Sequence, residues 1–331
     1  MKIAINGFGR IGRAVFKIAL DNPEMEIVAI NDLVELENLV YLLKYDTVYG
    51  AYKRSVEIKD SNLIVNGKEI EVFSQKNPTE LPWLDLGIDL VVESTGFFTD
   101  RAGAEGHLKA GAKKVLISAP TKDESIKTIV MGVNDNQLKA EDDIISNASC
   151  TTNCIAPIMK VLEDKFGVEK SLMSTIHSYT STQSLVDGSA KKDVRRGRAA
   201  ACNVIPTSTG AATATSLVVP QLKGIFNGMA YRVPTLVGSI SDVVAVLKRE
   251  VTVEEIVQAF QGVEAGSMKN ILRVTDEPLV SSDILGSNYS VIIQTELTKV
   301  VGGNLVKVVG WYDNEWGYSS RVVDLALKMK L

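Results

Sequence analysis

The stretch that decides the fold runs Lys2-Ile3-Ala4-Ile5-Asn6-Gly7-Phe8-Gly9-Arg10-Ile11-Gly12. Its first five residues alternate and are mostly apolar, which predicts a strand, and the residues after Gly12 continue with the spacing of an amphipathic helix. The turn between them reads G-x-G-x-x-G. In that pattern Gly7 permits the tight turn, Gly9 lets a pyrophosphate approach the backbone, and Gly12 lets helix and strand pack closely.

A second predicted strand, Glu26–Asn31, leads directly into Asp32, which lies about twenty residues after Gly12. A carboxylate at that distance is typical of the residue that binds an adenosine ribose. The alternative role of Asp32 is helix N-cap, because a helical pattern begins at Leu33. Strand, glycine turn, helix and carboxylate together predict dinucleotide binding.

The rest of the first half alternates strands with helices. Apolar runs predict strands at residues 90–96, 114–120, 129–133 and 144–146. This alternation predicts a Rossmann-type, doubly wound, mostly parallel sheet with helices on both faces.

Two features of this half need separate interpretation. Residues 54–75 are expected to form a hairpin around the turn Asn66-Gly67. His107 falls in the middle of a predicted helix and is interpreted as a surface or packing residue rather than a catalytic one.

A polar turn opens the second half. It reads Ser146-Asn147-Ala148-Ser149-Cys150-Thr151-Thr152-Asn153-Cys154 and leads into a predicted helix. The N–H groups and dipole of a helix N-terminus favour anions and lower the pKa of a nearby thiol, so Cys150 is a candidate nucleophile. The alternative is a small buried hydrophobe, as most cysteines are. Cys154, one helical turn further on, is interpreted as packed.

The residues that follow supply a histidine and further anion-binding candidates. An alternating strand, 171–180, delivers His177. The long loop 181–203 carries a basic run from Lys191 to Arg198. Loops of this length are often functional, and the alternative for most of these charges is a solvated face or a subunit contact. Residues 205–212 form a second turn of hydroxyls and glycine that opens a helix, another candidate anion site.

The last third of the chain contains long strands with few helices between them. They are expected at 229–234, 242–247 and 305–312. This pattern predicts an α+β second domain with a largely antiparallel sheet.

Composition narrows the function classes. The 331 residues suggest two domains, and 45% hydrophobic with 23% charged residues is ordinary for a soluble globular protein with a full core. A net charge of −4 predicts no nucleic acid as primary partner, and the absence of a long apolar run or signal peptide predicts a cytoplasmic protein with no membrane partner. Three cysteines and two histidines support neither a disulfide framework nor a metal site.

These parts suggest one chemistry. A thiolate adds to an aldehyde, and an imidazole can accept the proton of the adduct's hydroxyl. Hydride transfer to a nicotinamide then leaves a thioester. One anion site can hold a phosphate on the substrate, and the other a free phosphate that attacks the thioester. Sequence spacing alone does not place His177 beside Cys150.

The chain resembles the phosphorylating glyceraldehyde-3-phosphate dehydrogenases over essentially its whole length. The residues that carry the resemblance are the glycine turn 5–13, Val92-Glu93-Ser94-Thr95-Gly96, the run 145–154, His177-Ser178-Tyr179-Thr180, the segment 205–212, Arg232-Val233-Pro234-Thr235 and the segment 311–318. The run Ala148-Ser149-Cys150-Thr151-Thr152-Asn153-Cys154 is highly specific for this family.

The resemblance implies conversion of glyceraldehyde 3-phosphate, inorganic phosphate and NAD to 1,3-bisphosphoglycerate and NADH in glycolysis. Cys150 would be the nucleophile and His177 its base, while Thr180 and Arg232 would hold the substrate's phosphate. The residues implied for the attacking phosphate are Ser149, Thr151, Thr209, Gly210 and Arg195. Each charge-assisted bond from an arginine is about twice as strong as a neutral one.

The resemblance also assigns the NAD contacts and the assembly. The residues implied for NAD are Gly7, Gly9, Gly12, Arg10 and Ile11 in the pyrophosphate turn, Asp32 on the adenosine ribose, Lys76 and Ser118 along the cofactor, and Asn314 on the nicotinamide amide. Family members are homotetramers in which the long loop, here 178–203, meets a neighbour's cofactor. The implied NAD-binding domain is 1–149 with 315–331, and the implied catalytic domain is 150–314.

Three departures from the family pattern stand out. Ser189 replaces a proline that is frequent in NAD-preferring members, and its hydroxyl can donate to the 2′-phosphate of NADP. Asp32 repels that phosphate, so we expect NAD to be preferred with some NADP use. Thr213 stands where lysine is usual, and the segment 290–294 lacks the usual second serine and aspartate, which bears on packing more than on chemistry.

Three rival functions remain at this stage. Erythrose-4-phosphate dehydrogenase shares the fold, although Thr180 matches the triose enzyme. A Cys–His hydrolase or acyltransferase would need no glycine turn. A binding protein with a dormant site would not need the full set of reacting residues.

Overall fold

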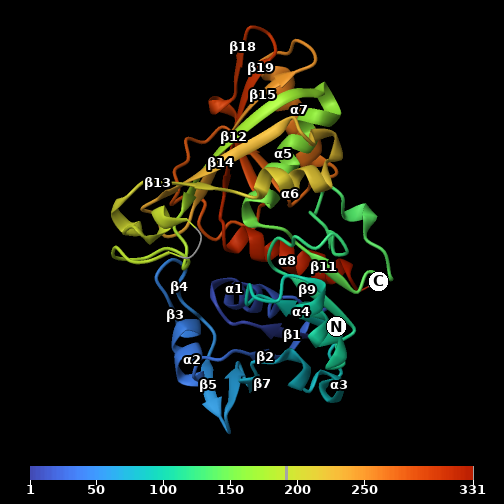
Figure 1. Ribbon diagram of the computed structural model, residues 1–331, viewed down its shortest axis with the longest axis vertical. Helices are drawn as coiled ribbons and strands as arrows, with labels where there is room; N and C mark the ends of the chain where they lie inside the picture. The colour runs from blue at the N-terminus through green and yellow to red at the C-terminus, as the bar shows by residue number, and fades with distance from the viewer. Residues whose placement is uncertain (191–192, 331) are drawn as a thin grey trace. The chain divides into compact units, whose positions relative to one another are not determined.

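The computed structural model describes residues 1–190 and 193–330, which form two compact units. The first unit comprises Met1–Ile129, Asn136–Ala148 and the C-terminal residues from Ser319 on. The second comprises Val130–Asp135 and Ser149–Tyr318. Figure 1 shows the first unit mainly in blue to green and the second mainly in green to red. Lys191 and Lys192 of the basic run lie outside the described residues.

The first unit is built on a nine-stranded sheet with the order β10-β11-β9-β8-β1-β2-β7-β6-β5. Its strands are β1 (Lys2–Asn6), β2 (Glu26–Asn31), β5 (Val56–Lys59), β6 (Asn62–Val65), β7 (Lys68–Phe73), β8 (Leu90–Glu93), β9 (Lys114–Ile117), β10 (Lys127–Thr128) and β11 (Ile144–Ser146). Every pair from β10 to β7 is parallel, which confirms the predicted Rossmann-type sheet. Strand order reverses between β1 and β8, and ligands of such sheets bind at the carboxyl ends of the strands there.

Helices and short elements complete this unit. They are α1 (Arg10–Ala19), α2 (Leu36–Lys44), the hairpin β3 (Tyr45–Asp46) and β4 (Gly50–Ala51), η1 (Pro78–Glu80), α3 (Trp83–Leu86), α4 (Arg101–Lys109), η2 (Asp135–Gln137) and α8 (Trp316–Lys328). Helix α8 begins in the second unit and enters the first at Ser319, and η2 begins at Asp135 of the second unit and continues into the first at Asn136.

Two local predictions in this unit are wrong. The expected hairpin is a three-stranded meander, because positive φ at Asp60 and Ser61 makes an extra turn between β5 and β6 before the predicted turn at Asn66-Gly67. The expected strand 129–133 is absent. Pairing ends at Thr128, and Gly132 turns the chain with a φ of +77° while its N–H donates to the Asp135 carboxylate at 2.8 Å.

The second unit is built on an eight-stranded mixed sheet with the order β13-β14-β12-β15-β19-β17-β16, and β18 pairs with β19. Its strands are β12 (Val168–Ser178), β13 (Ile205–Ser208), β14 (Phe226–Val233), β15 (Ser239–Leu247), β16 (Leu272–Thr275), β17 (Val291–Gln294), β18 (Lys299–Val301) and β19 (Leu305–Tyr312). Its helices are α5 (Cys150–Phe166), η3 (Val194–Gly197), η4 (Ala200–Cys202), α6 (Ala211–Val218), η5 (Pro220–Leu222), α7 (Val253–Ala265) and η6 (Thr295–Leu297).

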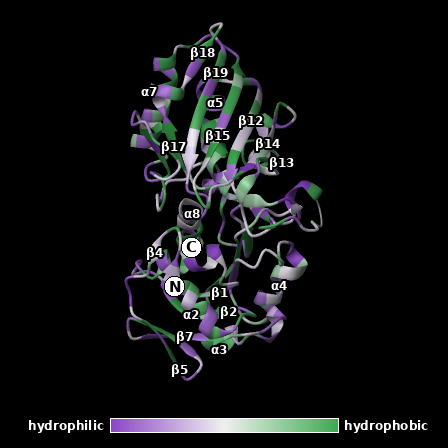
Figure 2. Ribbon diagram, turned by 90° about the vertical axis from the view of Figure 1, so that its left-hand side faces the viewer, coloured by the Kyte–Doolittle hydropathy of each residue, from purple (hydrophilic) through white to green (hydrophobic). Residues whose placement is uncertain are grey.

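Most neighbours in this sheet are antiparallel, as predicted, while β12–β14 and β16–β17 are parallel. Helix α5 packs on β12, β15, β17 and β19, and its buried residues include nearly every position from Thr151 to Leu162. Figure 2 shows hydrophobic stretches along the strands of this sheet. The sheet therefore has one face covered by a buried helix that begins at Cys150.

The glycine turn of the first unit has almost no spare room. A Cβ added at Gly12 would lie 2.1 Å from the Gly7 carbonyl oxygen, so only glycine lets α1 pack this closely on β1. The Ser94 hydroxyl donates to the same oxygen at 2.7 Å and thereby fixes the turn to the end of β8. A Cβ at Gly9 would meet nothing within 4 Å, so the space above the turn is open.

Gly12→Ala is therefore expected to destabilise the protein by about 1–3 kcal/mol, because backbone must move to relieve the clash. Gly9→Ala is the matched control and should change the free energy of unfolding by less than about 0.5 kcal/mol. Urea unfolding followed by tryptophan fluorescence measures both. Equal stability of the two variants would contradict this account of the turn.

Candidate active site

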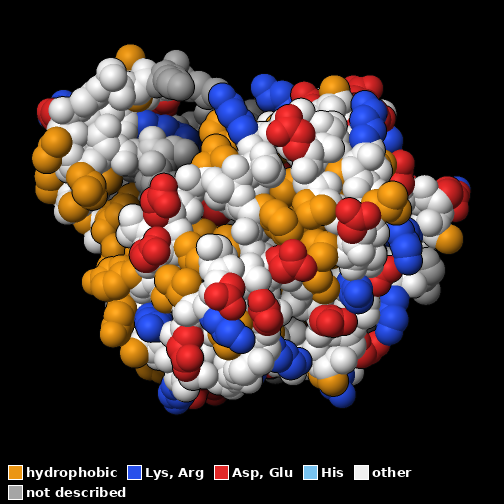
Figure 3. Space-filling model, turned by 90° about the horizontal axis from the view of Figure 1, so that it is seen from below, with side chains coloured by type: hydrophobic (Ala, Val, Ile, Leu, Met, Phe, Trp, Pro, Cys, Tyr) orange, Lys and Arg blue, Asp and Glu red, His pale blue; other side chains and the backbone are white. Residues whose placement is uncertain are grey.

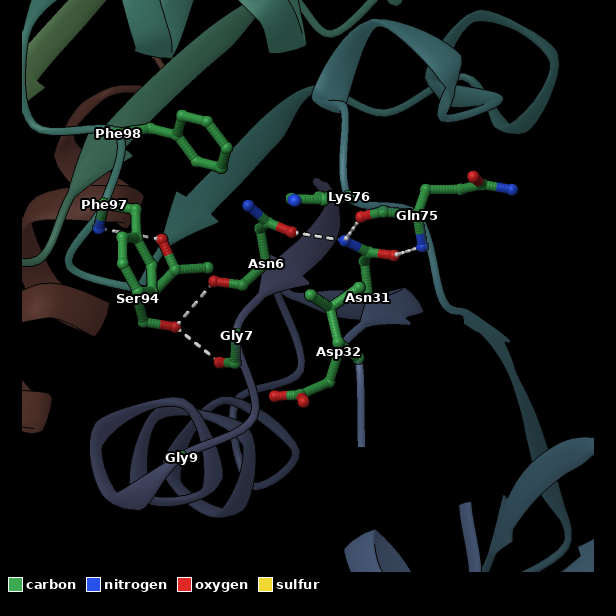
Figure 4. A pocket seen from close by; sticks show the side chains of 12 residues that line it. Asn6, Gly7, Gly9, Asn31, Asp32, Gln75, Lys76, Ser94, Phe97 and Phe98 are labelled. Atoms are coloured by element: carbon green, nitrogen blue, oxygen red, sulfur yellow. Dashed lines mark hydrogen bonds between the residues drawn. The ribbon is translucent and has the colours of Figure 1, made fainter. Parts of the chain in front are cut away.

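The glycine turn borders a cavity of about 620 Å³ in the first unit. Its lining includes four residues predicted from sequence, namely Gly7, Gly9, Asp32 and Lys76. Figure 4 shows Asp32 and Lys76 projecting from the ends of neighbouring segments around the turn. Leu33 and Phe97 also line the cavity and are strongly exposed, so apolar surface is available to a flat ring.

Asp32 is held at the mouth of the turn. Its Oδ2 accepts from the Phe8 N–H at 2.6 Å and its Oδ1 from the Val34 N–H at 3.0 Å. Helix α2 begins only at Leu36 with Glu35 as its N-cap, so the N-cap interpretation of Asp32 is wrong. A carboxylate fixed by two backbone donors keeps lone pairs for a ribose hydroxyl.

The other predicted residues of this unit lie around the same sheet edge. Arg10 and Ile11 open helix α1, and the Arg10 guanidinium donates to Asp46 at 2.6 Å and lies over the Tyr49 ring. The Arg10 side chain is thus held toward residues 46–49, and its backbone contributes to the helix N-terminus. Ser118 follows β9, where its N–H donates to the Glu93 carbonyl at 2.9 Å.

His107 is a packing residue in the core of this unit. It is fully buried, and its Nδ1 accepts from the Trp83 indole N–H at 3.0 Å. This leaves a proton on Nε2, which lies 3.2 Å from the Glu93 carboxylate. Its two ring nitrogens are therefore occupied by structural contacts.

The second unit places the thiol next to an imidazole. Ser149 is the N-cap of α5, and its Oγ accepts from the Thr152 N–H at 3.1 Å. Cys150 is the first residue of that helix, and its Sγ lies 3.4 Å from Nε2 of His177 near the end of β12. The preceding Ala148 adopts a φ of +55°, a conformation that costs a non-glycine residue about 1–2 kcal/mol. Such strain is common where a reactive side chain must be presented.

The tautomer of His177 follows from its other neighbour. Its Nδ1 lies 2.6 Å from the Ser178 carbonyl oxygen, which can only accept, and 2.9 Å from Arg232 Nη1, which can only donate. We assign the proton to Nδ1 because the carbonyl is the closer partner and Arg232 Nη1 has that same carbonyl as its own acceptor. The Nε2 lone pair therefore faces the Cys150 thiol. The Arg232 Nη1 donates to the same carbonyl at 2.9 Å. This arrangement makes His177 a proton acceptor toward Cys150.

Burial decides the ionisation of the pair. Burial and then the Arg232 charge lower the pKa of His177 to about 3, so the imidazole is neutral near pH 7. Burial raises the pKa of the Cys150 thiol, and the Arg232 charge and the bonds from Thr151 act in the opposite direction. The lowered thiol pKa expected from the helix N-terminus is thus outweighed, and the thiol needs a neighbouring base.

Arg232 is also an anion-binding candidate. It pairs with His177 across the parallel strands β12 and β14, and among the described residues its buried Nε has no hydrogen-bond partner. A buried donor without an acceptor costs about 1–3 kcal/mol. A phosphate oxygen would satisfy it. Thr180 lies just beyond β12, with its hydroxyl 3.0 Å from that of Thr182.

The two arginines of the long loop differ. Arg195 is exposed and pairs with Asp193 through Nε at 3.0 Å and Nη2 at 3.1 Å. Arg196 is half-buried, and its Nε donates to the Thr207 hydroxyl at 3.0 Å. Thr207 in turn donates to Asp193 at 3.0 Å.

Sheet register places Arg196 toward Arg232. Ile205 pairs with Arg232 and Thr207 with Ala230, so Thr207 and Arg232 share one face of the sheet as diagonal neighbours. The Arg196 charge also lowers the pKa of Arg232, after the larger effect of burial. Sequence reasoning missed Arg196 because two adjacent arginines cannot be distinguished without the fold.

The remaining anion candidates lie at helix starts. Thr209 follows β13, its Oγ1 accepts from the Ala211 N–H at 3.2 Å, and Gly210 is the N-cap of α6 with open space beside it. The Thr151 hydroxyl lies 3.1 Å from the buried Tyr312 hydroxyl, which also contacts Thr175 at 2.8 Å. Sequence reasoning treated Tyr312 only as a strand residue.

Cys154 and Asn314 are the last two residues singled out from the sequence. Cys154 is fully buried, its Sγ lies 3.9 Å from the Gly310 carbonyl oxygen, and burial raises its pKa. Asn314 follows β19, and its Oδ1 accepts from Gly238 and Ser239.

Within residues 1–190 and 193–330 no group of three or more His, Cys, Asp or Glu has the geometry of a metal site, and no helix is long and apolar enough to cross a bilayer.

Known proteins match the chain along most of its length. Two family models match: Glyceraldehyde 3-phosphate dehydrogenase, NAD binding domain, over residues 1–101, and Glyceraldehyde 3-phosphate dehydrogenase, C-terminal domain, over residues 149–314. Glyceraldehyde-3-phosphate dehydrogenase 1 of Bacillus subtilis (strain 168) is 56% identical over 327 residues, which cover 98% of this chain and 97% of that protein.

A second relative gives the same result. Glyceraldehyde-3-phosphate dehydrogenase of Geobacillus stearothermophilus is 55% identical over 327 residues, which cover 98% of this chain and 97% of that protein. These matches confirm the resemblance drawn from the sequence motifs. The chain belongs to the glyceraldehyde-3-phosphate dehydrogenase family.

Proposed function

We propose that the chain catalyses the NAD-dependent, phosphorylating oxidation of glyceraldehyde 3-phosphate to 1,3-bisphosphoglycerate in glycolysis. The observation that carries this proposal is the contact of 3.4 Å between Cys150 Sγ and Nε2 of His177. Arg232 adds a half-buried cation whose buried Nε is an unsatisfied donor beside this pair. The names of the two relatives above support glyceraldehyde 3-phosphate as the substrate and give no support to erythrose 4-phosphate as the alternative substrate.

The first unit fits NAD. The open space above Gly9, the carboxylate of Asp32 and the cavity of about 620 Å³ suit a pyrophosphate, a ribose and a base. The residues that would hold NAD are Gly7, Gly9, Arg10, Ile11, Gly12, Asp32, Lys76 and Ser118, with Asn314 on the nicotinamide amide. When bound, NAD accepts the hydride that leaves the substrate carbon.

The protein's own groups move the protons. As the Cys150 sulfur bonds to the aldehyde carbon, His177 Nε2 takes the thiol proton and passes it to the aldehyde oxygen, giving a hemithioacetal. His177 then takes the hydroxyl proton back as the carbonyl re-forms, which leaves a thioester on Cys150. A phosphate oxygen attacks the thioester carbon and the sulfur leaves. Of the protons on His177 and on the attacking phosphate, one re-forms the thiol and one goes to solvent.

Two phosphates need two sets of donors. Thr180 and Arg232 would hold the phosphate of the substrate. Ser149, Thr151, Thr209 and Gly210, at the starts of α5 and α6, would hold the attacking phosphate, since helix N-termini favour anions. We assign the loop arginine of this set to Arg196 rather than Arg195, because Arg195 is exposed and bound to Asp193.

The assembly proposed is a homotetramer, with residues 1–149 and 315–331 as the NAD-binding domain and 150–314 as the catalytic domain. The sheet face opposite α5 supports it, because Leu172, Val244 and Leu305 lie on that face and are exposed. Leu185, Val186 and Val194 of the long loop are exposed as well. On the face drawn in Figure 3, apolar side chains also lie between charged ones. We place the enzyme in the cytoplasm.

The first test separates Cys150 from Cys154. NADH formation from glyceraldehyde 3-phosphate, NAD and phosphate should fall by on the order of 10³-fold or more in Cys150→Ser, because the nucleophile is lost. Cys154→Ser should keep most of the activity, since its thiol is fully buried against Gly310. Absence of phosphate-dependent NADH in the wild type would overturn the proposed function, and equal loss in both variants would overturn the division of roles.

The second test separates the two arginines. Arg196→Ala should raise KM for phosphate roughly tenfold or more, because a charge-assisted bond contributes about 1.5–3 kcal/mol. Arg195→Ala is the matched control and should raise it much less, since its guanidinium is bound to Asp193. Initial rates at saturating NAD and aldehyde measure both. A larger rise in KM for phosphate in Arg195→Ala than in Arg196→Ala would return the phosphate-binding role to Arg195.

The third test concerns cofactor choice. We expect kcat/KM for NAD to exceed that for NADP at least about tenfold, because Asp32 repels a 2′-phosphate. Some NADP use is still expected, since the exposed Ser189 offers a hydroxyl donor where proline offers none. Asp32→Ala should lower the ratio of kcat/KM for NAD to kcat/KM for NADP, and Ser189→Pro should raise it. A wild-type preference for NADP would contradict this view of the ribose site.

A further inference from the structure

The side-chain amide of Asn314 has its oxygen end fixed by two donors. Its Oδ1 accepts from the Gly238 N–H at 3.1 Å and from the Ser239 hydroxyl at 2.9 Å. Ser239 is fully buried at the start of β15, and Asn314 is nearly so. An amide oxygen has two lone pairs, and both are used here. The Asn314 NH2 group is therefore left to point away from β15.

The hydroxyl of Ser239 also makes a second contact. Its Oγ accepts from the Ser178 N–H at 3.2 Å while its own proton goes to Asn314. Ser178 directly follows His177, and its carbonyl oxygen is the acceptor that fixes the His177 tautomer. A single buried hydroxyl thus connects the end of β12, which carries the base, to Asn314, two residues after β19.

An amide side chain that is free to turn presents either its oxygen or its nitrogen to a ligand. A carboxamide such as that of nicotinamide has one acceptor oxygen and one donor nitrogen, so the wrong end of Asn314 would face it with like groups. Buried polar networks of this kind restrict a side chain to one orientation when each member is satisfied. The required orientation is the one that Ser239 and Gly238 impose.

We propose that Ser239 is a positioning residue for hydride transfer, which sets the orientation of the Asn314 amide so that its NH2 group donates to the carboxamide oxygen of the nicotinamide. Ser239 does not touch the reacting atoms, and we assign its effect on the cofactor to its bond with Asn314 rather than to its contact with Ser178. This inference rests on the proposed function for the role of Asn314. It goes beyond that function in assigning a part to a serine outside the reacting set.

The test is a double-mutant cycle of Ser239→Ala and Asn314→Ala. We expect kcat/KM for NAD to fall about tenfold in Ser239→Ala, as loss of a buried hydrogen bond predicts, and further in Asn314→Ala. Because Ser239 acts through Asn314, the double variant should match Asn314→Ala within about twofold. The alkylation rate of Cys150 by iodoacetamide should stay within about twofold of wild type throughout, which a general loss of packing would not allow.

Ser241→Ala is the matched control. Ser241 lies two residues further along the same face of β15, is equally buried and lies against the Cys154 thiol rather than Asn314. It should leave kcat/KM for NAD within about twofold of wild type. A fall in kcat/KM for NAD in Ser241→Ala as large as that in Ser239→Ala would overturn the proposal. Loss of any buried hydroxyl from this strand would then have the same effect.

The double-mutant cycle also tests whether Ser239 acts through Asn314, and NAD binding separates this question from the proposed function. Multiplicative effects of the two single substitutions, or an unchanged Asn314→Ala, would show that Ser239 does not act through Asn314. NAD binding by calorimetry is measured on the same four proteins. If wild type binds NAD but forms no phosphate-dependent NADH, the proposed function fails, and the same cycle in NAD affinity still decides the role of Ser239.

Discussion

One carbonyl group determines the chemistry of the second unit. The Ser178 oxygen accepts from His177 Nδ1 at 2.6 Å and from Arg232 Nη1 at 2.9 Å. Because a carbonyl can only accept, it favours the tautomer whose lone pair faces the thiol, although Arg232 Nη1 also lies 2.9 Å from Nδ1. It also holds the Arg232 charge near the ring, and this charge together with burial keeps the imidazole neutral. The backbone of β12 thus prepares the base before any substrate binds.

Much of this molecule could be predicted from local patterns. The strand–turn–helix at residues 2–20 and the position of Asp32 at the carboxyl end of β2 follow from spacing alone, because a parallel sheet brings the carboxyl ends of its strands together. The place of Cys150 near a helix N-terminus follows from the polar turn at 146–154, whereas the N-cap role of Ser149 is seen only in the structure. The failures are also local. The extra turn at Asp60-Ser61 needs positive φ at residues other than glycine, which the sequence does not signal.

What could not be predicted depends on contacts distant in sequence. Tyr312 meets Thr151 across 161 residues, and Ser239 meets Asn314 across 75. The distinction between Arg195 and Arg196 depends on which guanidinium Thr207 and Asp193 engage. The pKa of Cys150 is another example, because a helix N-terminus predicts a lowering and the enclosure of the thiol decides the opposite.

The chain of contacts from Arg195 through Asp193 and Thr207 to Arg196 has a consequence for how an anion is received. Asp193 is a resident counter-ion, and the Arg195 guanidinium lowers its pKa to about 2, so it stays ionised at any working pH. A guanidinium already immobilised through Thr207 loses little further side-chain freedom when an anion arrives. The side-chain entropy that a phosphate site on a long loop would lose on binding is therefore lost largely when the protein folds.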